Sequence, residues 1–267
     1  MAVLSTVLVV APLVAIFAYL LFRGFGSLNL AFFTKVPAPV GETGGGMANA
    51  IVGSAVLLGI ASLIGVPLGI GAGIYLAEFG RGTKMAYAIR FTADVLNGVP
   101  SIVMGLAAFS LVVVPLKHFS AFAGGVALGI MMVPTICRSS EEMLLMVPHA
   151  VREAALGLGV PNWRSVLSIT VKTASPGIIT GCMLAFARVA GETAPLLFTA
   201  LGNQFWSTSL NEPIAALPLQ IYVYALSPYD DWHRLAWAGA LVLIVLIVLA
   251  VSLVRYVTSR GVLKGAS

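Results

Sequence analysis

Residues 184–199 read LAFARVAGETAPLLFT, an apolar stretch that carries two charged side chains, Arg188 and Glu192. An ionised side chain near the centre of a membrane helix costs about 2.5–3.5 kcal/mol even on lenient insertion scales, so it normally faces other helices or a watery cavity. Because the two charges are four residues apart, a helix would place them on one face, one turn from each other. Arg188 and Glu192 are therefore the first candidates for a transport path.

The whole chain has the composition of an integral membrane protein. Of its 267 residues, 59% are hydrophobic and only 9% are charged, whereas soluble domains carry roughly 25% charge. No stretch is polar enough to form a separate soluble domain, so we expect residues 1–267 to form one transmembrane domain surrounded by membrane lipid. The net charge of +5 reflects basic residues that cluster in particular loops, and we expect no nucleic acid as a partner.

Six segments are long and apolar enough to cross a bilayer, which takes about 20 residues. They are expected at residues 2–22, within 47–77, at about 92–115, 119–137 and 173–201, and at 235–254. The predicted fold is all-α, with six transmembrane helices and a long polar segment, residues 138–172, between the fourth and the fifth. Pro195 is predicted to break or kink the fifth helix just past the two charges, because proline lacks the N–H that an inner turn needs.

The basic residues indicate how the helices are oriented. Six spans place both termini on one side of the membrane. If that side is the cytoplasm, ten Lys and Arg residues lie in cytoplasmic segments and four in outer loops. The positive-inside rule favours this orientation. We therefore expect both termini and residues 138–172 to lie in the cytoplasm.

The polar segment 138–172 predicts a short helix–turn–helix at the membrane surface. Helix formers at 149–156 are followed by Gly157 and Gly159 as stop signals. Ala154 and Ala155 leave one face low enough for another protein to approach closely, and Glu153 beside them can pair with a basic residue of that partner. An amphipathic surface helix without a partner is the alternative.

This segment resembles the EAA loop of the permeases of ABC importers. Residues 153–155, then Gly159, then Ile169 match the spacing of that motif. The match departs at its end, where Lys172 replaces the proline of the family. The resemblance implies a type I importer permease fold, in which this loop is a coupling helix that docks into a groove of a cytoplasmic ATPase.

Four further stretches resemble the PstA-type permeases of bacterial phosphate importers. They are ETGGGMANAIVGS at 42–54, GIYLAEF at 73–79, LNGVPSIVMGL at 96–106 and ARVAGETAPLLFTALG at 187–202. The resemblance implies a transport subunit of the bacterial inner membrane, not an enzyme. Its expected partners are a PstC-type permease, two copies of a cytoplasmic ATPase, an extracytoplasmic phosphate-binding protein and inorganic phosphate.

No cofactor or metal is expected in this chain itself. It has no GxxxxGK[ST] phosphate loop, and the resemblance implies that ATP and Mg²⁺ are bound by the partner ATPase. Its two cysteines, Cys137 and Cys182, lie in apolar surroundings without ligand spacing, so they are expected to be small core residues.

The residues of the candidate path each have two possible roles. Arg188 presents a planar fork of donors that fits two phosphate oxygens, or it forms an ion pair with Glu192 that fixes helix packing; the resemblance favours the first role. Glu192 either neutralises Arg188 alone, or, as we hypothesise, also accepts a hydrogen bond from the P–OH group of phosphate, which sulfate lacks. Thr193 is either a donor to the substrate or a hydroxyl bonded to a backbone carbonyl.

Two polar groups are candidates for the inner mouth of the path. Asp94, Asn97 and Ser101 open the expected third span, either as capping residues or as a polar lining. The second group lies where the fourth span is expected to leave the membrane and consists of Arg138, Glu141 and Glu142. They are either solvated interfacial charges or, together with Asp94, an inner gate that forms and breaks when the ATPase docks.

Other classes of function are considered alongside an ATPase-driven transport subunit. A stand-alone channel or carrier has no use for a loop that docks an ATPase. A membrane enzyme lacks support, because the chain has no HExxH motif, no paired intramembrane carboxylates and no Ser/His constellation. Within the importers, the alternatives are the PstC-type partner permease and a permease for another oxyanion.

Overall fold

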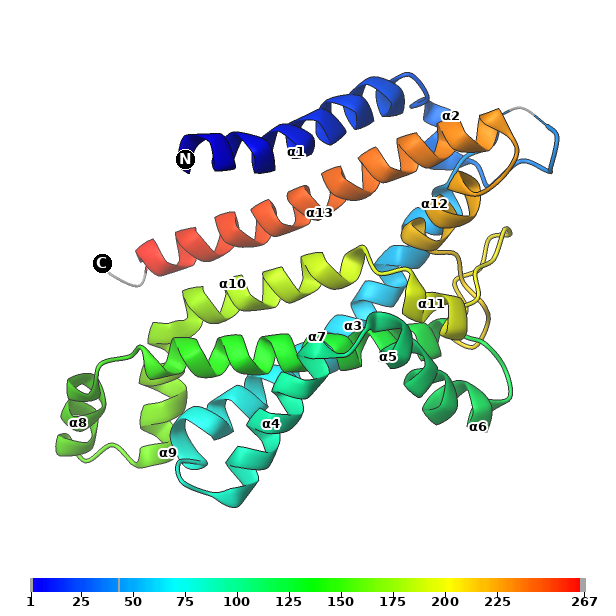
Figure 1. The fold of residues 1–267 in the computed structure, drawn as a ribbon. Coiled ribbons are helices and arrows are strands. Elements are labelled where there is room, and N and C mark those ends of the chain that lie inside the picture. The colour runs from blue at the N-terminus through cyan, green and yellow to red at the C-terminus, as the bar shows by residue number, and fades with distance from the viewer. Residues whose placement is uncertain (1, 43, 265–267) are drawn as a thin grey trace.

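The computed structural model describes residues 2–42 and 44–264, which fold into helices joined by short loops (Figure 1). Five helical segments in this part of the chain are long and apolar enough to cross a membrane. They are α1 (Ala2–Phe25), α3 (Ala48–Ile74) with its π-helical end η1 (Tyr75–Phe79), α7 (Ala121–Leu145), α10 (Val171–Ala190) with the preceding α9 (Asn162–Ser165) and η3 (Val166–Thr170), and α13 (Asp230–Lys264). A bent pair, α4 (Lys84–Gly98) and the helical run from α5 (Ser101–Ala108) to Leu116, is a sixth if its two parts together make one span. The predicted all-helical membrane fold is confirmed.

The third span is not the single helix that the sequence predicts at 92–115. The hydroxyl of Thr83 accepts a hydrogen bond from the backbone N of Ala86 at 3.1 Å, so α4 begins at Lys84, inside the expected loop. Pro100 has no N–H to continue the helical ladder and restricts the residue before it. The chain therefore turns by 112° before it starts α5 at Ser101 and continues through η2 (Phe109–Val113) into α6 (Val114–Leu116).

Two other spans extend beyond their apolar runs. α7 continues eight residues past Cys137 to Leu145, so the charges that were expected in a loop lie on its last turns. α13 begins at Asp230, before the expected residue 235. The expected loop 202–233 also contains a helix, α12 (Leu217–Ala225). A helix can continue through charged residues when those residues lie outside the hydrocarbon or form ion pairs with a neighbouring helix.

The helices run between two ends of the molecule (Figure 1). One end, which we call the α8 end, carries the short helix α8 (His149–Gly157) and both chain termini. The opposite end, which we call the α12 end, carries α12 and the short helix α2 (Leu30–Thr34). Of the predicted helix–turn–helix, the first helix is confirmed as α8, whereas the second is the start of the fifth span, which runs unbroken from Asn162 to Ala190 rather than beginning near residue 173.

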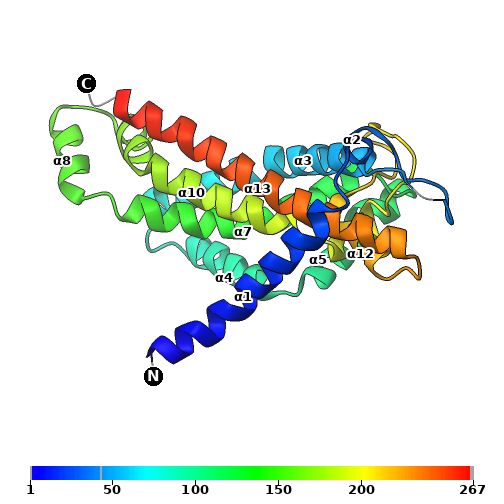
Figure 2. The same cartoon turned by 90° about the horizontal axis from the view of Figure 1, so that it is seen from above.

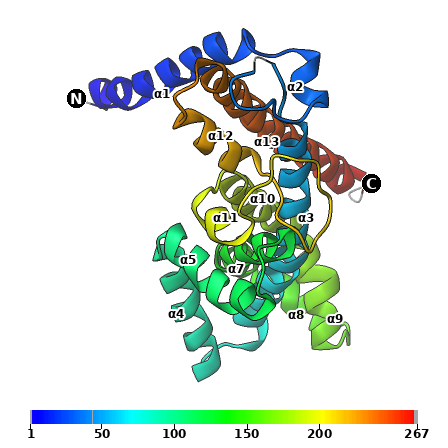
Figure 3. The same ribbon diagram turned by 90° about the vertical axis from the view of Figure 1, so that its right-hand side faces the viewer.

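α7 is the central helix of the bundle. It packs against α3, α4, α5 and α10, and α10 in turn packs against α13. Of the most apolar stretch of α7, 67% is buried, against 6% for α1. α1 contacts α13 near its own last turns, where the rings of Tyr19 and Trp237 meet at 5.1 Å, and then diverges from the bundle (Figures 2 and 3).

A row of glycines brings α3 and α7 unusually close together. A methyl group built on any of three glycines, four residues apart on α3, would lie 2.6–2.7 Å from a Cβ atom of α7, the pairs being Gly65–Met132, Gly69–Ile136 and Gly73–Ser140. In lipid there is little hydrophobic drive between helices, so close van der Waals contact between small residues holds them together. We call this contact the glycine seam.

The seam predicts that substitution at Gly69 destabilises the fold. Gly69→Leu would drive its side chain into Ile136, and overpacking of this kind costs about 1–3 kcal/mol. The matched control is Gly71→Leu, because Gly71 is exposed on the same helix and a methyl group added there would meet no other atom within 4 Å. We expect a lower thermal unfolding temperature in detergent for the first variant only, and equal temperatures for the two would contradict the seam.

Candidate functional site

The stretch around Arg188 lies at a break between two helices. α10 ends at Ala190 with Gly191 as its cap, and α11 (Ala194–Thr199) starts with Pro195 in its first turn. Arg188 therefore lies in the last turn of α10, whereas Glu192 lies beyond its end. The expectation that both lie on one helical face is wrong, because the break falls between them rather than after them.

Arg188 and Glu192 do not form an ion pair in the part of the chain that the structure describes. The Arg188 side chain is exposed and Glu192 is half-buried. Glu192 helps to line a cavity of about 10 Å³ with Ser54 and Ala216, which is at the lower limit for a single water molecule. This chain alone therefore does not form a passage beside Glu192 that is wide enough for an oxyanion.

The polar bend between α4 and α5 adjoins this break. Asn97 accepts a hydrogen bond from the hydroxyl of Thr135 on α7 at 3.0 Å. Ser101 starts α5, and α5 packs on α11 so closely that a methyl group on Gly105 would lie 2.7 Å from the Cα of Pro195. The structure thus places Ser101 on the helix that packs against α11, which follows Glu192 and Thr193, and it places Asn97 on α4, which contacts α7.

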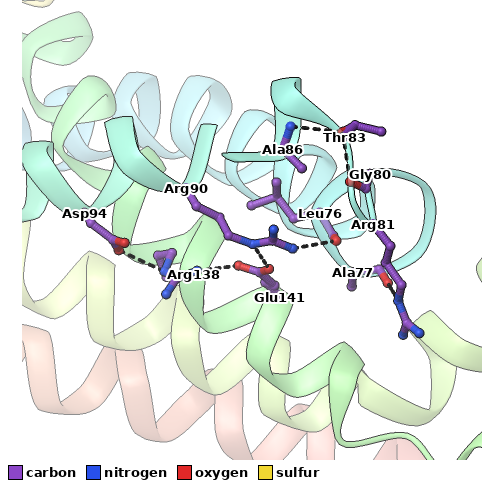
Figure 4. Close-up of polar contacts among 10 residues, drawn as sticks. All are labelled: Leu76, Ala77, Gly80, Arg81, Thr83, Ala86, Arg90, Asp94, Arg138 and Glu141. Atoms are coloured by element: carbon purple, nitrogen blue, oxygen red, sulfur yellow. Dashed lines mark hydrogen bonds and ion pairs between the residues drawn. The ribbon is translucent and has the colours of Figure 1, made fainter. Parts of the chain in front are cut away.

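A second group of charges connects α4 to α7 nearer the α8 end (Figure 4). The carboxylate of Glu141, only 3% exposed, accepts from Arg90 Nε on one oxygen and from Arg138 Nη1 on the other, both at 2.6 Å. Arg138 Nε also reaches Asp94 Oδ1 at 3.0 Å. Two guanidinium groups thus compensate a buried carboxylate, which is the condition under which such a charge is tolerated. We call these four residues the inner cluster.

The inner cluster differs from the sequence expectation in two residues. Glu142, which was expected with Arg138 and Glu141, is exposed and lies outside it, because the next residue on a helix points about 100° away. Arg90 belongs to the inner cluster but was assigned to a loop. Recognition of Thr83 as a helix cap would have placed Arg90 and Asp94 four residues apart on one face of α4.

The inner cluster and Arg188 lie at different depths of the bundle. Gly181 of α10 packs against Ser139 of α7, which is next to Arg138. Arg188 is seven residues further along α10, which is roughly 10 Å at 1.5 Å per residue. The chain therefore presents one cation near the helix break and a neutralised cluster two turns closer to the α8 end.

The EAA-like segment forms α8 and the turn after it. Ala155 is buried, whereas Glu153 and Ala154 are exposed on the outer side of α8. Gly159 has φ +78, a backbone conformation that glycine adopts without strain, so the turn depends on this residue. Where the motif has a proline, Lys172 lies within a helical stretch that runs unbroken from Asn162 to Ala190.

Comparison with known proteins matches most of the chain. The family model described as binding-protein-dependent transport system inner membrane component matches residues 65–261. The chain is 49% identical to the phosphate transport system permease protein PstA of Yersinia pestis over 89% of this chain and 81% of that protein. It is 35% identical to the probable PstA of Methanocaldococcus jannaschii over 94% of this chain and 89% of that protein.

The fold is similar to that of a solved importer. A chain of the MetNI methionine ABC transporter, in an inward-facing conformation, superposes with a TM-score of 0.60 over 82% of this chain and 96% of that one. The two sequences are 18% identical, so this likeness concerns the fold only. It agrees with the helical arrangement around α7.

The geometry of the inner cluster predicts that loss of the Glu141 charge loosens α4. Glu141→Gln leaves two arginines facing each other without their shared carboxylate, and we expect it to lower the free energy of unfolding by about 1–3 kcal/mol, since both arginines are partly solvated. Glu142→Gln is the matched control, because this neighbour is exposed. Thermal unfolding in detergent measures both, and an unchanged unfolding temperature for Glu141→Gln would show that the inner cluster does not hold α4.

Proposed function

Because the chain belongs to the family of binding-protein-dependent transport permeases and, within it, to the PstA-type phosphate permeases, we propose that it works as the membrane subunit of an ATP-driven phosphate importer. The observation that carries this conclusion is the identity of about one half with PstA relatives over nearly nine tenths of the chain. The chain has five helices that could cross a membrane, or six with the bent pair, and its fold is similar to that of a MetNI importer chain. The membership disfavours a stand-alone channel or carrier.

The phosphate path is proposed to pass Arg188 at a boundary with a second permease. Phosphate carries between about −1 and −2 charges near neutral pH, so one arginine does not balance it. Arg188 is exposed, and the cavity beside Glu192 is too small for phosphate. Both observations support a path that a PstC-type partner completes, with Glu192, Thr193, Asn97 and Ser101 on this chain's side.

The proposed docking element for the ATPase is α8. Of the residues expected to dock, Glu153 and Ala154 are exposed whereas Ala155 is buried, and exposed apolar side chains lie beside them at Leu156, Leu158 and Trp163. Such a surface at a membrane boundary is suited to protein contact. The α8 end, with both termini, then faces the cytoplasm, as the distribution of basic residues predicts.

Transport is proposed to follow alternating access. A phosphate-binding protein delivers the anion at the α12 end. Two copies of the ATPase, which bind ATP and Mg²⁺, move α8 and its counterpart on the partner permease when they close. The inner cluster is the proposed gate at the α8 end, because its Arg138–Asp94 pair is partly exposed, at 31% and 57%, and water can replace it.

Replacement of Arg188 tests the path. Arg188→Gln removes the charged fork, and loss of a charge-assisted contact of about 1.5–3 kcal/mol corresponds to a roughly 10- to 100-fold fall in phosphate transport. Arg255→Gln on α13 is the control, since it removes an equal charge from an exposed position. Phosphate uptake and phosphate-stimulated ATPase activity of the purified, reconstituted complex measure the effect. Unaltered uptake by Arg188→Gln would remove this residue from the path.

Replacement of Glu192 tests how phosphate is distinguished from sulfate. If Glu192 accepts the P–OH hydrogen, its negative charge also repels sulfate, which has no such proton. Glu192→Gln is then expected to weaken phosphate transport and to let sulfate compete. Uptake of radiolabelled phosphate with and without excess sulfate measures this. A variant that keeps both full uptake and full rejection of sulfate would disprove the hypothesis.

A further inference from the structure

Three arginines from different elements bind the last residues of α3 and η1. Arg81 Nε donates to the carbonyl oxygen of Ala77 at 2.9 Å, and Arg90 Nη2 on α4 donates to that of Leu76 at 3.1 Å (Figure 4). Arg152 Nη2 on α8 binds Glu78 Oε1 at 2.7 Å. Carbonyl groups at a helix end lack partners within the helix, and here α4 and the chain's own next turn supply them. Residues 76–78 are therefore a point where α3, α4 and α8 meet.

The Arg152–Glu78 pair is the buried part of this junction. The two side chains are 12% and 8% exposed, and the same Arg152 nitrogen donates to the carbonyl oxygen of Leu144 at 2.7 Å. A single guanidinium thus joins α8 to the ends of α3 and α7. Its Nε and Nη1 atoms are buried and meet no acceptor in the described part of the chain.

Stability alone accounts poorly for such a pair. Buried donors without acceptors cost free energy, and a buried ion pair is often no more stabilising than apolar residues of similar volume. What this pair does provide is a fixed position of α8 relative to α3. The glycine seam holds α3 against α7. A displacement of α8 is therefore expected to move α3 and α7 together.

Polar contacts, joined by the backbone of residues 76–78, lead from α8 to the inner cluster. They run from Arg152 to Glu78, along residues 76–78 to Arg90, from Arg90 to Glu141, and from Glu141 through Arg138 to Asp94. The first link is buried, whereas the last link is partly exposed. When α8 moves, the buried Arg152–Glu78 pair is therefore expected to stay together and the partly exposed Arg138–Asp94 pair to separate.

We propose that residues 76–78 form a relay that carries the motion of α8 to the inner cluster, with Arg152, Glu78 and Arg90 as positioning residues. The proposal rests on the proposed function, since it requires an ATPase that moves α8. The Arg152–Glu78 link stays closed through the transport cycle, and the Arg138–Asp94 link opens. If the Arg152–Glu78 link is lost, ATP hydrolysis continues but no longer opens the inner cluster.

The test is the number of phosphate ions transported per ATP hydrolysed by the complete importer in proteoliposomes. Glu78→Gln is expected to lower this ratio about tenfold, within the range typical of coupling between sites, while ATP hydrolysis continues. Glu78→Gln combined with Arg152→Gln is expected to lower it no further, because both changes break one link. Lys84→Gln is the control, an exposed cation of α4 outside the relay.

Each outcome decides for or against the relay. An unchanged ratio in Glu78→Gln overturns it, and so does a further large fall in the double variant. If Glu78→Gln does not assemble with its partners, Arg152→Gln alone replaces it, since it removes the charge and the Nη2 donor that binds Glu78 and Leu144; full coupling in that variant overturns the relay. A wild-type complex that does not transport phosphate would instead disprove the proposed function.

Discussion

The close backbone approach of α3 and α7 is the constraint on which the other contacts depend. In lipid, side chains gain little by leaving the solvent, so a helix pair is held by the atoms that touch. The glycines of α3 let α7 approach until Ile136 and its neighbours fill the space that side chains would occupy. α7 can then contact α4, α5 and α10 on its remaining sides. The inner cluster on α4 and α7 and the contacts of residues 76–78 are both positioned relative to this pair.

The charged side chains of the bundle follow from the same constraint. A buried carboxylate such as Glu141 is tolerated because α4 brings Arg90 to it and α7 itself supplies Arg138. Arg188, by contrast, lies in the last turn of a helix without such compensation in the described structure. The difference separates charges that hold helices together from an exposed charge, which we propose contacts the substrate.

The sequence predicted the fold class well because apolar length is a direct consequence of bilayer thickness. It located α8, and it grouped Arg138 with Glu141 and Asp94, which the structure brings into contact. It failed where helices continue past the hydrocarbon, as α7 does to Leu145, and where one begins in polar sequence, as α4 does after Thr83. It also failed at residues 191–193, since a break in an apolar run is set by packing against α5 as much as by Pro195. Contacts between distant residues, such as Arg152 with Glu78, leave no local pattern to read.

The sharp bend at Pro100 has a consequence for how the protein is made. α4 has 15 residues and carries Arg90 and Asp94, so as a nascent segment it is both too short and too polar to enter the bilayer by itself. Its countercharges belong to α7, which the ribosome synthesises later. We therefore expect this segment to settle in the bilayer only once the downstream helix that carries its countercharges is present.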